Sequence, residues 1–173
     1  MTFSIPAIIR AFVAPRHKIF CSRKLWNQSL GELYRRGKGQ GESGAFLLGH
    51  INGDKRQITR FVFYDDVETN CLDSGIVIFT GAGYGLLWKI CRESGLQVVA
   101  DVHTHPGLAL QSGSDRDNPM IATPGHLALI IPNLAERPPE ISELGIYEYL
   151  GAHHWIDHSG RKAANVFYIG YWG

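Results

Sequence analysis

The sequence contains little cysteine. Its three cysteines, Cys21, Cys71 and Cys91, are an odd number and form no Cys-x-x-Cys pair. Such a set argues against a disulfide framework and suits a reducing compartment. We therefore expect a cytoplasmic protein whose fold is held together without disulfides.

Long apolar runs and basic tracts are also absent. No apolar run has the length of a membrane span, so we expect no contact with a membrane. The apolar opening segment, residues 1–15, is interrupted by Arg10 and has no basic stretch before it, which favours an edge strand or a packed arm over a signal peptide. No run of Lys and Arg is interleaved with aromatic residues, so nucleic acid is not the expected partner.

Charge is nearly balanced overall but is unevenly distributed along the chain. The 173 residues carry a net charge of +1, with 45% hydrophobic residues, which predicts one globular domain over residues 1–173. Residues 1–62 hold 11 basic and 3 acidic residues, and residues 63–173 hold 6 and 13, giving +8 and −7. This asymmetry indicates either a face that attracts an acidic partner or two solvated faces that offset each other.

Caps, turns and apolar periodicity divide the chain into helices and strands. Ser22 and Gly37 are typical caps for a helix between them, and a second helix is predicted over residues 80–95. Asn52-Gly53 predicts the turn of a hairpin over residues 45–66. Further strands are predicted at residues 76–79, 96–105, 127–133 (apolar throughout and therefore central), 145–151, 153–158 and 166–172. The pattern indicates an α/β fold of the α+β type, with about seven strands and two helices.

The stretch ADVHTHPGLALQSGSDRDNP, residues 100–119, places metal-binding side chains directly after an apolar strand. Residues two apart on a strand share a face, so His103 and His105 point the same way, and Pro106 ends the strand. A catalytic zinc typically takes three protein ligands and keeps a fourth position for water. The loop that follows the strand carries carboxylates that could supply the third ligand.

These residues resemble the signature of the JAMM metalloproteases of the JAB1/MPN family. His-Thr-His-Pro is followed by Ser-Gly-Ser-Asp, and the upstream segment Glu42–Gly49, ESGAFLLG, is similar to the family's glutamate at the start of a strand that ends in glycine. The order of helices and strands also resembles the MPN fold, a central curved mixed sheet flanked by about two helices. The short chain is most similar to compact prokaryotic deubiquitinase-like members, which are often encoded in ubiquitin-like conjugation operons, including antiviral ones.

The resemblance implies a role for each signature residue. His103, His105 and Asp115 would hold Zn²⁺, Glu42 would be the general base, and Ser112 would donate a hydrogen bond to the developing oxyanion. The spacer of five residues between Pro106 and Ser112 is one residue shorter than is usual in the family. A second register, with Ser114 and Asp117 in these roles, is therefore also possible. We favour the first register because Ser-Gly-Ser-Asp resembles the family's common Ser-Gly-x-Asp.

The resemblance also implies a substrate. The expected reaction is hydrolysis of the amide bond after the C-terminal tail of a ubiquitin-like protein, which releases that protein from a conjugate or a precursor. The alternatives are a peptidase that trims the tail of a sulfur carrier or another small protein, and a non-catalytic MPN scaffold. A scaffold would lack one or more motif residues, and all are present. Five other histidines are expected to be structural or to lie at the surface: His50, His126, His153, His154 and His158.

Overall fold

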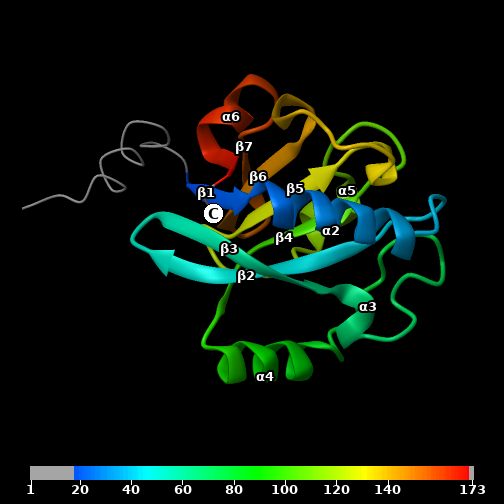
Figure 1. Cartoon of the computed structure of the whole chain (residues 1–173). Helices are drawn as coiled ribbons and strands as arrows, with labels where there is room; N and C mark the ends of the chain where they lie inside the picture. Colours follow the sequence, from blue (N-terminus) through cyan, green and yellow to red (C-terminus); the bar gives the residue numbers. More distant parts are fainter. Residues whose placement is uncertain (1–17, 172–173) are drawn as a thin grey trace, which may run out of the picture.

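One eight-stranded sheet organises the structure, a computed structural model that describes residues 18–171 (Figure 1). The strand order is β7-β6-β5-β4-β2-β3-β1-β8. The pairs β4–β5, β1–β3 and β1–β8 are parallel and the others antiparallel, which confirms the predicted mixed sheet in an α+β fold. The strands are β1 Ile19–Ser22, β2 Gly44–Asn52, β3 Lys55–Phe63, β4 Gln97–Thr104, β5 Leu127–Ile131, β6 Gly145–Gly151, β7 His154–Asp157 and β8 Phe167–Gly170.

The two predicted helices are present, and α2 has the predicted caps. In α2 the Ser22 side chain accepts a hydrogen bond from the Leu25 N–H at 3.2 Å, and Gly37 ends the helix. In α4 the C-cap is Gly95, whose φ of 67° suits glycine. No helix within residues 18–171 is long and apolar enough to cross a membrane. The helices are α2 Arg23–Arg36, α3 Tyr64–Val67, α4 Tyr84–Ser94, α5 Gly113–Asp117 and α6 Ala163–Val166, with 3-10 turns η1 Asn133–Ala135, η2 Ile141–Glu143 and η3 Gly160–Lys162.

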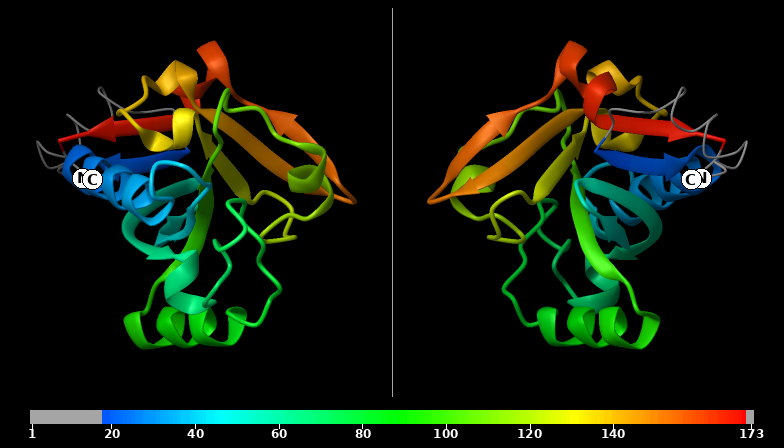
Figure 2. Two further views of the ribbon diagram at one scale, coloured as in Figure 1. Left: turned by 90° about the vertical axis from the view of Figure 1, so that its right-hand side faces the viewer. Right: turned by 90° about the vertical axis from the view of Figure 1, so that its left-hand side faces the viewer.

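The sheet is curved and carries apolar cores on both faces. The views in Figure 2 place β6 and β7 on one flank and β1 and β8 on the other, with α4 at the far end. The curvature brings Lys18, just before β1, to 2.8 Å from Glu148 of β6. Strand β2 is buried on both faces: Leu47 packs in the core beneath α2, whereas Phe46 packs in the core beside α4. The functional side chains described below therefore project from a strongly packed sheet.

Three details differ from the prediction. Residues 76–79 form a loop, not a strand. Strand β1 was not predicted, so the sheet has eight strands rather than about seven. The hairpin turn is Gly53-Asp54, because Asn52 still pairs with Lys55. The predicted edge strand or arm at residues 1–15 lies outside the described residues.

A buried carboxylate, that of Glu68, binds the backbone at the start of α4. Glu68 is 8% exposed and accepts hydrogen bonds from the Thr80 N–H and hydroxyl, both at 2.6 Å, and from the N–H groups of Gly81 (3.2 Å) and Gly83 (3.1 Å). Helix α4 has no side-chain cap at its N-terminus. Glu68, which is distant in sequence, instead accepts hydrogen bonds from donors at the start of this helix. Burial raises the pKa of Glu68, but these hydrogen bonds outweigh burial, so the pKa is lowered.

We expect Glu68→Gln to lower the free energy of unfolding by about 1–3 kcal/mol at pH 7, because the amide replaces an acceptor oxygen with a donor among buried N–H groups. Urea unfolding measures this difference. Glu93→Gln is the matched control, since its exposed pair with Lys89 at 3.9 Å contributes at most about 1 kcal/mol. The folded pKa of Glu68 is lowered, so its contribution is present at neutral pH and disappears as the pH falls through that pKa. Equal stability of wild type and Glu68→Gln at pH 7 would contradict this role.

Candidate metal centre

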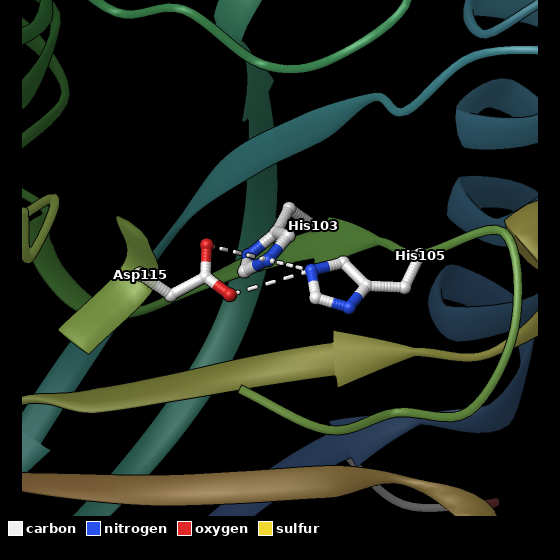
Figure 3. Close-up of side chains that lie close together, drawn as sticks. All are labelled: His103, His105 and Asp115. Carbon is white, nitrogen blue, oxygen red and sulfur yellow. Dashed lines mark hydrogen bonds and ion pairs between the residues drawn. The ribbon is translucent and has the colours of Figure 1, made fainter. Parts of the chain in front are cut away.

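The two histidines of the signature meet at the end of β4. His103 lies in β4 and His105 directly follows it; their Nε2 atoms are 2.9 Å apart (Figure 3). His103 is 9% exposed. Thr104, between them, is fully buried, and its hydroxyl oxygen accepts a hydrogen bond from the Ser43 N–H at 2.9 Å. The alternation of a strand thus directs both imidazoles to one face.

Asp115 reaches the histidines from the short helix α5. Its Oδ1 lies 3.5 Å from His103 Nε2 and its Oδ2 lies 3.4 Å from His105 Nε2. Ser112 is the N-cap of α5: its hydroxyl oxygen accepts from the Asp115 N–H at 3.2 Å, and its own N–H donates to Asp115 Oδ2 at 2.7 Å. The spacing Ser-x-x-Asp is therefore also a capping box, and this box fixes the Asp115 carboxylate.

The three groups fit a small divalent cation. The ligand atoms of His103, His105 and Asp115 all lie within 4.8 Å of one another. Tetrahedral zinc with bonds of about 2.0–2.2 Å requires ligand atoms about 3.4 Å apart. Each Asp115 oxygen lies near that distance from one imidazole, Oδ1 at 3.5 Å from His103 Nε2 and Oδ2 at 3.4 Å from His105 Nε2. A single bound oxygen would need a shift towards the second histidine, and the two nitrogens, 2.9 Å apart, would need to move outward.

The electrostatics of the group also favour a positive charge between its members. Burial raises the pKa of Asp115, but hydrogen bonds with His103 and His105 outweigh it and hold the pKa far below the usual range. Burial lowers the pKa of His103, but the hydrogen bond and charge of Asp115 outweigh it, so that pKa is raised. A cation bound here would compensate the Asp115 carboxylate in the same way as a proton on His103 does.

The second register places its carboxylate elsewhere. Asp117 is exposed on α5 and is not part of the group of three, whereas Ser114 lines the cavity beside it. The geometry thus brings together the side chains of the shorter spacer, His103, His105 and Asp115.

Glu42 approaches the group from the neighbouring strand. It lies just before β2, which pairs antiparallel with β4 so that Gly44 is opposite His103. Its Oε1 is 3.9 Å from His105 Nε2, and its Oε2 accepts a hydrogen bond from the Val77 N–H at 3.3 Å. A Cβ atom on Gly44 would lie 2.1 Å from the Tyr64 ring, so glycine is required where this chain segment enters the sheet. Glu42 is thus beside the candidate ligands without being one of them.

A cavity of about 110 Å³ extends from this group into the protein. It is lined by Glu42, His103 and Asp115 and also by Asp101, which the sequence analysis did not single out. His126, predicted to be structural, is buried and lies 2.6 Å from Asp101. The other histidines within residues 18–171 lie apart from the group: His50, His153 and His154 are exposed, and His158 is 2.9 Å from Glu148.

Comparison with known proteins gives three findings. No protein-family model matches the chain. Over 63 residues it is 33% identical to the probable metalloprotease y4jG of Sinorhizobium fredii (strain NBRC 101917 / NGR234), a match that spans 36% of this chain and 39% of that relative. The fold is similar to the solution structure of protein DSY2949 from Desulfitobacterium hafniense, with a TM-score of 0.61 and 17% identity over 87% of this chain and 93% of that chain. The chain is thus similar in part to a protein named a metalloprotease, and it holds a His, His and Asp group that could bind a metal.

Proposed function

We propose that this protein is a metallopeptidase of the JAMM type, which hydrolyses an amide bond with a zinc ion held by His103, His105 and Asp115. The observation that carries the proposal is the convergence of these three ligand atoms within 4.8 Å, with the Glu42 carboxylate beside them. The name of the relative from Sinorhizobium fredii supports the same class of reaction.

Each residue of the site has a chemical task in this proposal. Zinc supplies Lewis acidity, which lowers the pKa of water and polarises a carbonyl oxygen. Glu42 accepts the proton of the attacking water and returns it to the leaving amine. The Ser112 hydroxyl uses its oxygen to accept from the Asp115 N–H, so its own proton remains available for the developing oxyanion.

The proposed substrate is the extended C-terminal tail of a ubiquitin-like protein. The cavity is lined from two loops, by Val77 of one and by Gln111 of the other. The same loops expose apolar side chains, with Ile76 at 54% and Leu108 at 76%. At such a place an extended peptide can form hydrogen bonds with main-chain groups and make small apolar contacts, whereas a folded surface cannot. A role in a bacterial ubiquitin-like conjugation or antiviral system is part of the proposal and rests on the resemblance of the signature.

We expect zinc-loaded protein to cleave a reporter fused to the tail of its ubiquitin-like partner, at the end of that tail. Replacing the small residue before the scissile bond with a large one should lower kcat/KM at least about tenfold, or about 1.4 kcal/mol, because Val77 and Phe79 line the site. Gel-based kinetics of the released reporter measure both values, with a chelator as the control. Cleavage that resists the chelator would exclude the metal mechanism, and no cleavage of any tail fusion would favour a scaffold or a peptidase for other small proteins.

A further inference from the structure

A second buried carboxylate faces the cavity and has no task in the proposed reaction. Asp101 lies on β4 two residues before His103, on the same face of the strand, and is 2% exposed. Its Oδ1 lies 2.6 Å from His126 Nε2, and its Oδ2 accepts a longer hydrogen bond from the Tyr64 hydroxyl at 3.4 Å. Burial and the charge of Asp101 raise the pKa of Tyr64 well above its usual value, which keeps that hydroxyl a donor.

The contacts of Asp101 do not use all the hydrogen-bond acceptor positions of its carboxylate. An ionised carboxylate offers about four acceptor positions, and two donors contact this one. Within residues 18–171 no Lys or Arg side chain forms an ion pair with it; Arg56 donates instead to the carbonyls of Val99 and Gly125. A buried carboxylate is costly unless donors or opposite charge compensate it. Asp101 is therefore able to accept a further donor, above all a cation, from the cavity.

The distance between Asp101 and the candidate metal centre indicates which kind of cation could bind Asp101. Two residues along a strand span about 6.7 Å, which separates Asp101 from His103 at the candidate metal centre. A substrate whose amide bond lies at that centre must therefore bridge several ångströms to reach Asp101. Long side chains with an apolar stem and a charged tip do this. The cavity that contains both groups also has apolar lining residues: Val77, Phe79, Met120, Ile130 and Trp155.

We propose that this cavity is a specificity subsite for a lysine or arginine side chain of the substrate, which lies within two residues of the scissile bond but not directly before it, and whose cationic tip binds Asp101. The inference rests on the proposed peptidase function and adds a substrate preference to it. The basic residue contributes a positive charge that no Lys or Arg side chain within residues 18–171 brings to Asp101, and its stem covers the apolar lining.

Peptides that differ at one position test the subsite. A zinc-loaded enzyme is given a panel in which each position within two residues of the scissile bond, except the one directly before it, carries lysine, arginine, norleucine or glutamate in turn. At one position we expect kcat/KM for lysine or arginine to exceed that for norleucine at least about tenfold, since hydrogen bonds to charged groups are the stronger ones. In Asp101→Asn, which keeps the size of the side chain, this ratio should fall to within about twofold of unity. Asp117→Asn removes the same charge from the exposed face of α5 and should keep the wild-type ratio.

Several outcomes would overturn the inference. One is a wild-type enzyme that shows no preference for a basic residue at any position, and this comparison remains decisive if Asp101→Asn does not fold. Another is an Asp101→Asn variant that is folded but loses kcat/KM by the same factor on every peptide. Asp101 would then only support Tyr64 and His126.

A binding measurement separates this inference from the proposed function. N-acetyl-lysine methylamide should shift the NMR signals of His126 and Tyr64 in wild type and in Asp117→Asn, but not in Asp101→Asn, and the norleucine compound should shift none of them. If no peptide is cleaved but lysine binds in this way, the peptidase function fails and the subsite stands. If peptides are cleaved but lysine neither binds nor is preferred, the subsite proposal is wrong and the peptidase function stands.

Discussion

Asp115→Ala is expected to weaken Zn²⁺ binding at least about 100-fold, because loss of a direct ligand should cost no less than loss of a residue that only supports one. The carboxylate of Asp115 is the anionic member of the group, 3.5 and 3.4 Å from the imidazoles of His103 and His105. Asp117→Ala, two residues further along the same helix, should leave the affinity within about twofold, since its exposed side chain is not part of the group. Competition with a chromophoric chelator measures both affinities.

Asp115 also accepts the hydrogen bond from the Ser112 N–H, so its removal disturbs the cap of α5. Asp115→Asn separates the two effects. The amide keeps an oxygen for the cap but loses the negative charge, so this variant should retain the fold and still lose most of the affinity. If Asp117→Ala weakens binding more than Asp115→Ala does, the longer spacer with Ser114 and Asp117 is the correct register.

The parts of the fold that the sequence predicted well are those that local physics determines. Ser22 begins α2 because its side-chain oxygen accepts from the Leu25 N–H, and Gly37 ends it where a Cβ atom would lie 2.3 Å from the Gly41 carbonyl oxygen. His103 and His105 share a face because a strand repeats every two residues. The motif Ser-x-x-Asp is likewise local: the spacing that the family signature requires is also the spacing of a capping box, so the folding of α5 itself aims the Asp115 carboxylate.

Elements that depend on distant partners were predicted poorly. Residues 76–79, Ile-Val-Ile-Phe, have strong strand propensity, but the N–H group of Val77 donates to Glu42 and that of Ile78 to the Cys71 carbonyl rather than to a neighbouring strand. Strand β1 was missed for the converse reason, since its four residues pair in parallel with β3 and β8, far away in sequence.

Buried polar clusters assembled from several elements were also missed. Asp101, Tyr64 and His126 come from β4, α3 and the segment before β5, separated by 37 and 25 residues. Glu68 contacts donors 12 to 15 residues further along the chain. No pattern of spacing within the sequence marks such contacts, because the curvature of the sheet and the path of the loops create them.

Glu42→Gln is expected to lower kcat on a tail-fused reporter by about 10²–10⁴-fold, because an amide cannot accept the proton of the attacking water. The fold should be retained, since glutamine keeps an acceptor oxygen for the Val77 N–H, which Glu42 Oε2 binds at 3.3 Å. Zinc content should also be retained, because Glu42 lies 3.9 Å from His105 Nε2 and outside the group of three ligand atoms. Single-turnover kinetics together with elemental analysis of the same sample measure both properties.

Glu32→Gln is the matched control for this variant. Glu32 is an exposed carboxylate on α2 that pairs with Arg35 at 2.6 Å, so its replacement should leave the rate close to that of wild type. Cleavage by Glu42→Gln at a rate near wild type would remove Glu42 as the base, and equal losses in both variants would trace the effect to a general change of charge. A loss of zinc in Glu42→Gln would instead make Glu42 a ligand. Only a slow variant that is folded and fully loaded with zinc fits a carboxylate that stands beside the metal and moves the proton.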